Sequence, residues 1–431
     1  MSTLLRLATA GSVDDGKSTL VGRLLHDTKS ILADQLDAVE RVSRERGLET
    51  ADLALLTDGL RAEREQGITI DVAYRYFATP TRSFVLADCP GHVEYTRNTV
   101  TGSSTADVIV LLVDARRGVL EQTRRHLAVA SLLRVPHVIV AVNKIDLVGF
   151  AEDVFRVVEE EVLKVVNDLG IPGATVMPVS ALHGDNIAER SESTEWYAGP
   201  SLLELLETLP AGADPKGQPF RLPVQYVLRP QSAAVAPALV EYRGYAGQVA
   251  SGIVRVGDQV SVLPSGRAAR VTGIDTADGE LEEAFAGQSV SVRLSDDIDL
   301  SRGDLIAGTD AAPEPTRQVE ALICWLHHRP LRPGDKVLLK HTTRTVRAIV
   351  RELDSRLDLD TLTGVPAQQL ELNDIGRVQL KLADEISAET YAESRQTGSF
   401  LLIDAQSGHT LAAGMIRSTV PEDLSATDWV I

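Results

Sequence analysis

One eight-residue segment, 11–18, constrains the fold of this chain more than any other; it reads GSVDDGKS. The segment matches the pattern G-x-x-x-x-G-K-[ST]; it follows a predicted strand, 4–8, and opens a predicted helix, 17–25. In that setting glycines let backbone N–H groups surround the phosphates of a nucleotide, Lys17 supplies a positive charge, and the Ser18 hydroxyl can bind Mg²⁺. The sequence therefore predicts a P-loop nucleotide-binding domain.

Short β-branched segments alternate with helical stretches through the first part of the chain. This rhythm is typical of a doubly wound, mostly parallel sheet. The apolar runs 108–113 and 138–142 are too short to span a membrane, so they fit buried parallel strands. We expect further strands at 84–86 and 175–178 and a closing helix at 202–209.

Two breaks in composition divide the chain. Residues 210–219 (PAGADPKGQP) are rich in proline and glycine, and beyond them short alternating runs are separated by Gly-Asp and Ser-Gly pairs. A second break, 311–315 (AAPEP), is followed by more sequence of the same all-β kind. We therefore predict an α/β P-loop G domain and two small all-β barrels, with limits 1–212 for the G domain, 213–314 for domain II and 315–431 for domain III.

The base is indicated by the segment 143–146 (NKID), which directly follows the predicted strand 138–142. A carboxylate at Asp146 can accept hydrogen bonds from N1–H and the exocyclic amine of guanine, a pair of donors that adenine lacks. Farther along, 180–182 (SAL) follows the last predicted strand and can offer a backbone N–H to guanine O6. Each match alone could be an ordinary turn, but their order behind the P-loop favours GTP over ATP.

Two further segments are expected to sense the γ-phosphate. In 88–92 (DCPGH), Asp88 can hold Mg²⁺ through a water molecule and the Gly91 amide can meet the γ-phosphate. In 65–69 (EQGIT), Thr69 can complete the metal sphere. Both segments would then relax when hydrolysis removes that phosphate.

His92 is the candidate catalytic residue, because it adjoins Gly91 at the position where a polar side chain can orient the attacking water. The alternative is a solvated loop histidine. We expect the other histidines, including the pair 327–328, to be surface residues. Near the two switch segments the sequence offers no obvious arginine finger; Arg64 and Arg97 are candidates without a predicted position.

The predicted site is made of three overlapping sets. The candidate catalytic residue is His92, and the candidate metal ligands are Ser18, Thr69 and, through water, Asp88. The predicted GTP-binding residues are Gly11, Ser12, Val13, Asp14, Asp15, Gly16, Lys17, Ser18, Thr19, Asp88, Cys89, Pro90, Gly91, His92, Asn143, Lys144, Ile145, Asp146, Ser180, Ala181 and Leu182.

Composition limits the partners and the compartment. The chain has 43 Lys and Arg against 61 Asp and Glu, a net charge of -18, which disfavours non-specific attraction to nucleic acid or anionic lipid. It has two cysteines, Cys89 and Cys324, so a disulfide framework is implausible and a reducing compartment, the cytoplasm, is expected. Residues 1–15 (MSTLLRLATAGSVDD) contain no long apolar core that ends in a small-residue cleavage site, and nowhere do eighteen apolar residues run together, so we expect neither secretion nor a membrane span.

The order of these motifs, followed by two predicted barrels, resembles the translation-factor class of GTPases, such as elongation factor Tu. Longer strings resemble more narrowly the large, GTPase subunit of bacterial sulfate adenylyltransferase: TDGLRAEREQGITIDVAYRYF at 57–77, CPGHVEYTRNTVTGSSTAD at 89–107 and EWYAGPSLLELLE at 195–207. Asp14 and Asp15 follow that subunit and not the translation factors. Ala87, before Asp88, and Thr99, where methionine is common, depart from it without touching a phosphate or base contact.

The resemblance implies a partner, the small catalytic subunit, which forms adenosine 5′-phosphosulfate and pyrophosphate from ATP and sulfate. It also implies that GTP hydrolysis, with GTP and Mg²⁺ bound to this chain, drives that uphill synthesis within a hetero-oligomer. Sulfate chemistry is then not expected in this chain. In some bacteria an adenylylsulfate kinase is fused behind such a subunit; this sequence contains no second P-loop.

Two alternatives stay open. The chain could be a translational GTPase of the elongation factor Tu type that acts with tRNA or the ribosome. It could also be a G domain that serves as a binding switch without useful turnover. Binding to the small catalytic subunit or to tRNA would separate the first two functions, and measured GTP turnover would separate both from the third.

Overall fold

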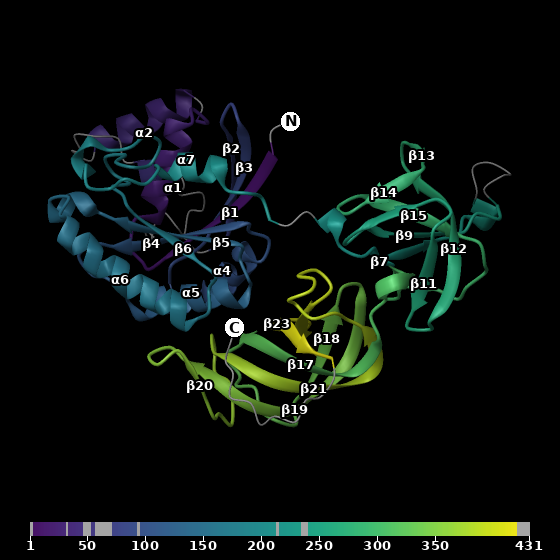
Figure 1. Ribbon diagram of the computed structural model, residues 1–431. Coiled ribbons are helices and arrows are strands. Elements are labelled where there is room, and N and C mark those ends of the chain that lie inside the picture. Colours follow the sequence, from purple (N-terminus) through teal and green to yellow (C-terminus); the bar gives the residue numbers. More distant parts are fainter. Residues whose placement is uncertain are drawn as a thin grey trace. The chain divides into compact units, whose positions relative to one another are not determined.

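The computed structural model in Figure 1 describes residues 3–31, 33–45, 53–56, 71–92, 95–212, 215–233 and 240–419. The segment 65–69, with the candidate metal ligand Thr69, lies outside the described residues, and so does Arg64. The chain forms two compact units. The first holds the described residues up to Gly212 together with Asp358–Thr363, and the second holds the other described residues.

The first unit is built on a six-stranded sheet in the order β2-β3-β1-β4-β5-β6. Its strands are β1 (Thr3–Gly11), β2 (Ala73–Ala78), β3 (Arg82–Asp88), β4 (Val108–Asp114), β5 (His137–Asn143) and β6 (Ala174–Pro178). Neighbouring strands are parallel except β2 and β3, which are antiparallel. The prediction of a mostly parallel sheet is confirmed, and β2 is an edge strand that the sequence analysis did not include.

Helices cover both faces of this sheet, with α1 and α7 on one face and α5 and α6 on the other (Figure 1). Every residue of β4 is buried, as expected for a central parallel strand between two helical layers.

None of the helices in the described part of the chain combines the length and the hydropathy needed to span a membrane. The helices are α1 (Lys17–Asp27), α2 (Ala33–Glu45), α4 (Thr96–Ser103), α5 (Glu121–Leu132), α6 (Glu152–Asp168) and α7 (Leu202–Thr208), with 3₁₀ turns η1 (Leu53–Leu56), η3 (Ile145–Val148) and η4 (Glu192–Thr194).

The second unit contains two antiparallel barrels. The first barrel has the sheet order β7-β16-β11-β12-β15-β9-β8, with β13 beside β12 and a separate pair β10-β14. An isolated bridge between Arg221 and Ser251 joins the first strand to the segment after β9. Its strands are β7 (Arg221–Pro223), β8 (Tyr226–Leu228), β9 (Gly244–Gln248), β10 (Ile253–Arg255), β11 (Gln259–Leu263), β12 (Arg267–Thr276), β13 (Gly279–Leu281), β14 (Glu283–Phe285), β15 (Ser289–Leu294) and β16 (Leu305–Gly308).

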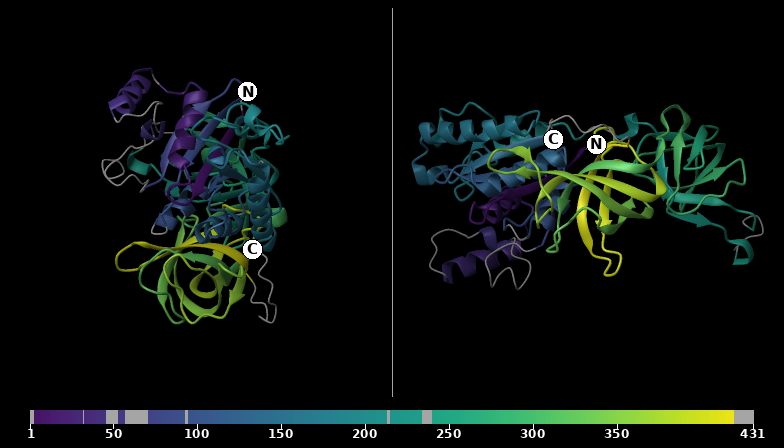
Figure 2. Two further views of the ribbon diagram at one scale, coloured as in Figure 1. Left: turned by 90° about the vertical axis from the view of Figure 1, so that its left-hand side faces the viewer. Right: turned by 90° about the horizontal axis from the view of Figure 1, so that it is seen from below.

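In the second barrel six strands close in the order β18-β22-β23-β17-β21-β19, because β18 also pairs with β19; the left view of Figure 2 shows this barrel end-on, in green to yellow. Closure removes the exposed strand edges that an open sheet would leave. Trp325 lies fully buried in its core and donates from Nε1 to the Arg329 carbonyl oxygen at 2.9 Å. The strands are β17 (Pro315–Trp325), β18 (Lys336–His341), β19 (Arg344–Asp358), β20 (Thr363–Val365), β21 (Ile375–Ser387), β22 (Ser399–Ile403) and β23 (Thr410–Ser418).

The predicted fold class is confirmed: an α/β G domain is followed by two small all-β barrel domains. The predicted domain limits at residues 212 and 314 stay predictions.

Candidate nucleotide-binding site

The P-loop connects the carboxyl end of β1 to α1. Gly16 has φ +95° and Asp14 has φ 69°, a left-handed backbone that aspartate tolerates better than most side chains. A Cβ at Gly16 would lie 2.4 Å from Asn143 Nδ2, so this position needs glycine for space as well. At the start of the loop, a Cβ at Gly11 would lie 2.9 Å from the Leu112 carbonyl oxygen. The loop is therefore packed directly against β4 and against the end of β5.

Hydrogen bonds inside the loop hold its shape. The Ser12 N–H donates to Asp15 Oδ2 at 2.7 Å, and Lys17 Nζ donates to the carbonyl oxygens of Gly11 at 2.9 Å and Ser12 at 2.7 Å. Ser12 Oγ is buried and has no hydrogen-bond partner among the described residues. A buried hydroxyl and a lysine at the amino end of a helix fit an anionic ligand such as a phosphate.

Lys17 and Asp15 are both buried, so their charges depend on each other. Burial lowers the pKa of Lys17, while the charges of Asp15 and Asp88 oppose that shift. Burial raises the pKa of Asp15, while the hydrogen bond from Ser12 and the charge of Lys17 oppose that shift. The two side chains therefore stabilise each other's charged form, and a phosphate would give Lys17 a further counter-charge.

Asn143 links three of the predicted segments. It is buried at the end of β5, and its Nδ2 donates to the Asp15 carbonyl oxygen of the P-loop at 2.7 Å. Its Oδ1 accepts a hydrogen bond from the Ala181 N–H at 2.9 Å. One side chain thus ties the segment 143–146 to the P-loop and to 180–182.

Asp114, at the end of β4, organises the same edge of the sheet. Its buried carboxylate accepts from Arg116 Nη2 at 2.7 Å and from Lys144 Nζ at 3.1 Å. Burial by itself would raise the pKa of Asp114, but the hydrogen bonds from Arg116 and Lys144 outweigh it and hold the pKa well below its usual range. Since Lys144 Nζ also donates to the Asp14 carbonyl oxygen, Asp114 fixes a lysine that rests on the P-loop.

The other residues of the two base-reading segments differ in exposure. Ile145 and Ser180 are fully buried and anchor the backbone, whereas Leu182 is 49% exposed. The Asp146 carboxylate is partly exposed and lies 3.8 Å from His183 Nε2. Asp146 can therefore meet a ligand while the residue before it remains in the core.

The segment that follows β3 lies against the P-loop. Asp88 ends β3 and accepts a hydrogen bond from Thr9 Oγ1 at 2.9 Å. A Cβ at Gly91 would lie 2.2 Å from Lys17 Nζ and 2.6 Å from the Gly11 carbonyl oxygen. Glycine at this position therefore lets the segment approach the P-loop lysine closely.

His92 is exposed, and its ring centroid lies 5.9 Å from that of Tyr95. Cys89 and Pro90 are buried, and burial raises the pKa of the Cys89 thiol, which keeps it protonated. Arg97 is exposed on α4. The ring of His92 is therefore open to a ligand or to water, whereas Cys89 packs within the protein.

The described residues of the predicted site thus come together at the carboxyl edge of the sheet, where ligands of open α/β sheets bind. Val13, Ser18 and Thr19 are half-buried in the loop and the first turn of α1. The described site residues therefore lie together, as the order of the motifs in the sequence predicts. Their roles as ligands stay predictions.

Comparison with known proteins covers nearly the whole chain. Residues 2–213 match the family model of the elongation factor Tu GTP binding domain, and residues 318–417 match the GTP-eEF1A C-terminal domain-like model. Sulfate adenylyltransferase subunit 1 of Bacteroides fragilis is 49% identical over 428 residues, which are 99% of this chain and 88% of the relative. The same subunit of Alteromonas mediterranea is 46% identical over 426 residues, 98% and 89% of the two chains. The bifunctional enzyme CysN/CysC of Mycobacterium tuberculosis is 52% identical over 422 residues, 97% and 68% of the two chains.

The chain belongs to the family of sulfate adenylyltransferase large subunits. The predicted family and the predicted enzyme class, a GTPase of this family, are both confirmed.

A histidine that we expected at the surface holds the P-loop of this chain. That expectation was wrong for His126, on α5, and for His341, on β18, both of which are buried. His126 Nδ1 accepts a hydrogen bond from the Gly11 N–H at 3.0 Å, and the side-chain amide of Gln122 lies 3.1 Å from Nε2. Burial lowers the pKa of His126 to about 3, so its ring is neutral near pH 7 and can accept at Nδ1.

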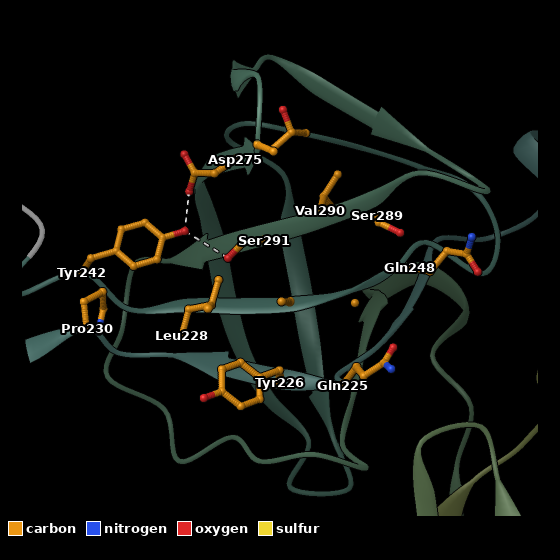
Figure 3. A pocket seen from close by; sticks show the side chains of 14 residues that line it. Gln225, Tyr226, Leu228, Pro230, Tyr242, Gln248, Asp275, Ser289, Val290 and Ser291 are labelled. Carbon is orange, nitrogen blue, oxygen red and sulfur yellow. Dashed lines mark hydrogen bonds between the residues drawn. The ribbon is translucent and has the colours of Figure 1, made fainter. Parts of the chain in front are cut away.

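A separate cavity of about 670 Å³ lies on the first barrel (Figure 3). Tyr226, on the edge strand β8, is 64% exposed beside it, and the Tyr242 hydroxyl lies 2.8 Å from Asp275 Oδ2 and 3.0 Å from Ser291 Oγ. Among the residues that the structure describes, those that line the cavity include neither lysine nor arginine. This described lining therefore offers no counterpart to the P-loop lysine.

Proposed function

We propose that the site at the carboxyl edge of the sheet binds the phosphates of GTP together with Mg²⁺. In this proposal residues 11–19 surround the phosphates, Lys17 contributes its charge, and Ser18 and, through water, Asp88 hold the metal ion. The support is the buried, unpartnered Ser12 hydroxyl in the described chain and the approach of Gly91 to Lys17. Thr69 is proposed as a further metal contact from the sequence alone.

Guanine is proposed to be read by Asp146 and by a backbone N–H of the segment 180–182. Because the Ala181 N–H donates to Asn143, we assign the contact with guanine O6 to the N–H of Leu182. The partly exposed Asp146 carboxylate supports its role as acceptor for N1–H and the exocyclic amine.

Hydrolysis is proposed to depend on His92, whose exposed ring can orient a water molecule toward the γ-phosphate. Bound Mg²⁺ would neutralise negative charge on the β- and γ-phosphates. Gly91 would sense the γ-phosphate with its amide, since its lack of a side chain lets the segment lie against Lys17. Loss of the γ-phosphate would then release this segment.

The biological role that we propose is to couple GTP hydrolysis to the synthesis of adenosine 5′-phosphosulfate from ATP and sulfate. A small catalytic subunit would carry out that synthesis within a hetero-oligomer, in a reducing, cytoplasmic compartment. The observation that carries this proposal is similarity over nearly the whole of this chain, at 46% and 49% identity, to proteins named sulfate adenylyltransferase subunit 1. Two free, buried cysteines fit the compartment.

Co-purification tests the partner. The chain, carrying an affinity tag, is expected to retain the small catalytic subunit and not to sediment with ribosomes or bind tRNA. A parallel measurement of GTP binding uses Lys17→Ala, which should abolish tight binding, and Lys164→Ala as control, because Lys164 is exposed on α6. Retention of tRNA or ribosomes in place of the small subunit would favour the translational function instead.

A further inference from the structure

Arg23, which no motif of the sequence analysis includes, connects α1 to the segment 180–182. Its Nε donates to the Ala181 carbonyl oxygen at 3.3 Å, and its Nη2 donates to the Leu182 carbonyl oxygen. The side chain is 19% exposed and also lies against Gly184, where a Cβ would be 3.7 Å from Arg23 Cδ. A single guanidinium group therefore fixes two consecutive carbonyl groups of the loop.

The ends of this loop are closed by its own backbone. The Ser180 N–H donates to the Asp185 carbonyl oxygen at 3.1 Å, and the Gly184 N–H donates to the Ser180 carbonyl oxygen at 2.7 Å. The tip, at Ala181 and Leu182, is held from outside by Asn143 on one side and by Arg23 on the other. The orientation of the tip thus depends on side chains that come from β5 and α1.

The direction of the Leu182 N–H follows from the contact with Arg23. In a trans peptide the C=O of one residue and the N–H of the next point in opposite directions. Since Arg23 holds the Ala181 carbonyl oxygen, the Leu182 N–H points away from that guanidinium. Within the described part of the chain, no atom accepts a hydrogen bond from this N–H.

We propose that Arg23 is a positioning residue that sets the selectivity of the site for a purine with an oxygen at position 6. It does so by orienting the peptide between Ala181 and Leu182. This inference rests on the proposed function, in which the Leu182 N–H contacts guanine O6. Arg23 itself does not touch the nucleotide.

The matched control is Asp27, the carboxylate that faces Arg23 on α1. Asp27 Oδ1 lies 3.7 Å from Arg23 Nη1 and 2.8 Å from His26 Nδ1. Asp27→Asn removes the ion pair but leaves both contacts of Arg23 with the loop, so it should keep the selectivity of the wild type. Arg23→Lys keeps the charge and one donor group, so it should retain part of the selectivity.

The experiment measures dissociation constants of the full chain for GTP, ITP and 2-aminopurine riboside triphosphate, and for the wild type also that of ATP. GTP and ITP carry O6, and 2-aminopurine does not. We expect Arg23→Gln to weaken GTP and ITP about tenfold, the effect of one lost hydrogen bond, and to change 2-aminopurine binding less than about twofold. Arg23→Lys should give a smaller loss, and thermal unfolding of each variant reports its folding.

Two results would overturn the role of Arg23 alone. One is an equal loss of affinity for all three nucleotides, which would make Arg23 a general support of the fold. The other applies when the wild type prefers GTP over 2-aminopurine riboside triphosphate. It is a ratio of the two affinities that keeps the wild-type value in both Arg23 variants. A wild type that does not prefer GTP over ATP would overturn the proposed guanine site and this inference together.

Discussion

The polar side chains that we propose to surround the nucleotide also make hydrogen bonds and ion pairs within the protein. Lys17 contacts two P-loop carbonyl groups, Asn143 joins two loops, and the Asp114 carboxylate fixes Lys144. Asp146 differs, because the side chain that lies 3.8 Å from its carboxylate is an exposed histidine, His183. A change at Asp146 should therefore alter base recognition more than it alters the fold.

We predict that Asp146→Asn exchanges the preferred base. An amide at this position offers a donor where the carboxylate offers only acceptors, so it should weaken GTP about a hundredfold and favour xanthosine triphosphate. The measurement is a competition of GTP and xanthosine triphosphate for the purified variant. Wild-type affinity for GTP in this variant would contradict the role of Asp146.

We predict that His126 makes the stability of the G domain depend on pH. The ring has a pKa of about 3 in the folded chain and about 6.5 when unfolded, so its contribution is complete above pH 6.5 and is lost as the pH falls toward 3. His126→Asn keeps a side-chain acceptor but does not titrate. The free energy of unfolding of the wild type, minus that of His126→Asn, should fall by about 2 kcal/mol when the pH is lowered from 6.5 to 5.

Denaturant unfolding of the wild type and of His126→Asn at several pH values measures this difference. His341 is also buried with a lowered pKa, but it is present in both proteins and cancels. A difference between wild type and variant that does not change with pH would mean that His126 does not titrate as proposed.

At the scale of elements, the loops after β1, β3, β5 and β6 meet because parallel strands place their carboxyl ends at one edge. The P-loop and the segment after β3 can be in contact because residue 91 is glycine. The space beside Lys17 is too small for a side chain at this position. The two loops are therefore expected to move together when the γ-phosphate is lost.

We predict that Gly91→Ala impairs binding of GTP more than it impairs folding. The added Cβ would fall 2.2 Å from Lys17 Nζ and 2.6 Å from the Gly11 carbonyl oxygen, so the segment or the lysine must shift. We expect at least a tenfold rise in the dissociation constant for GTP. Gly217→Ala is the control, because a Cβ there would meet nothing within 4 Å. Equal affinities of both variants would contradict the close contact.

Much of this architecture could be predicted because its signals are local. The P-loop match predicted the turn between β1 and α1, and runs of apolar residues predicted β4 and β5. The edge strand β2 was missed, since its alternating exposed residues, AYRYFA, form no apolar run. Arg23 and His126 were missed for another reason: their contacts with Ala181 and Gly11 join residues 158 and 115 positions apart. Such pairs are created by the fold and leave no periodic pattern.

At the scale of the whole molecule, the G domain and the two barrels carry no sulfate chemistry in our account. Binding of the small catalytic subunit would order the segments that contact the γ-phosphate, and the occupancy of its active site would then control the rate of GTP hydrolysis. Coupling of the two reactions requires such a dependence. The chain alone should therefore hydrolyse GTP slowly.

The most direct test of this account is the GTPase rate measured under four conditions. These are the chain alone, the chain with the small subunit, the same mixture with ATP and sulfate, and the chain with ribosomes. We predict that the rate rises when the small subunit is added and rises again when ATP and sulfate are added, and that ribosomes have no effect. A rate that is indifferent to the small subunit but raised by ribosomes would contradict it.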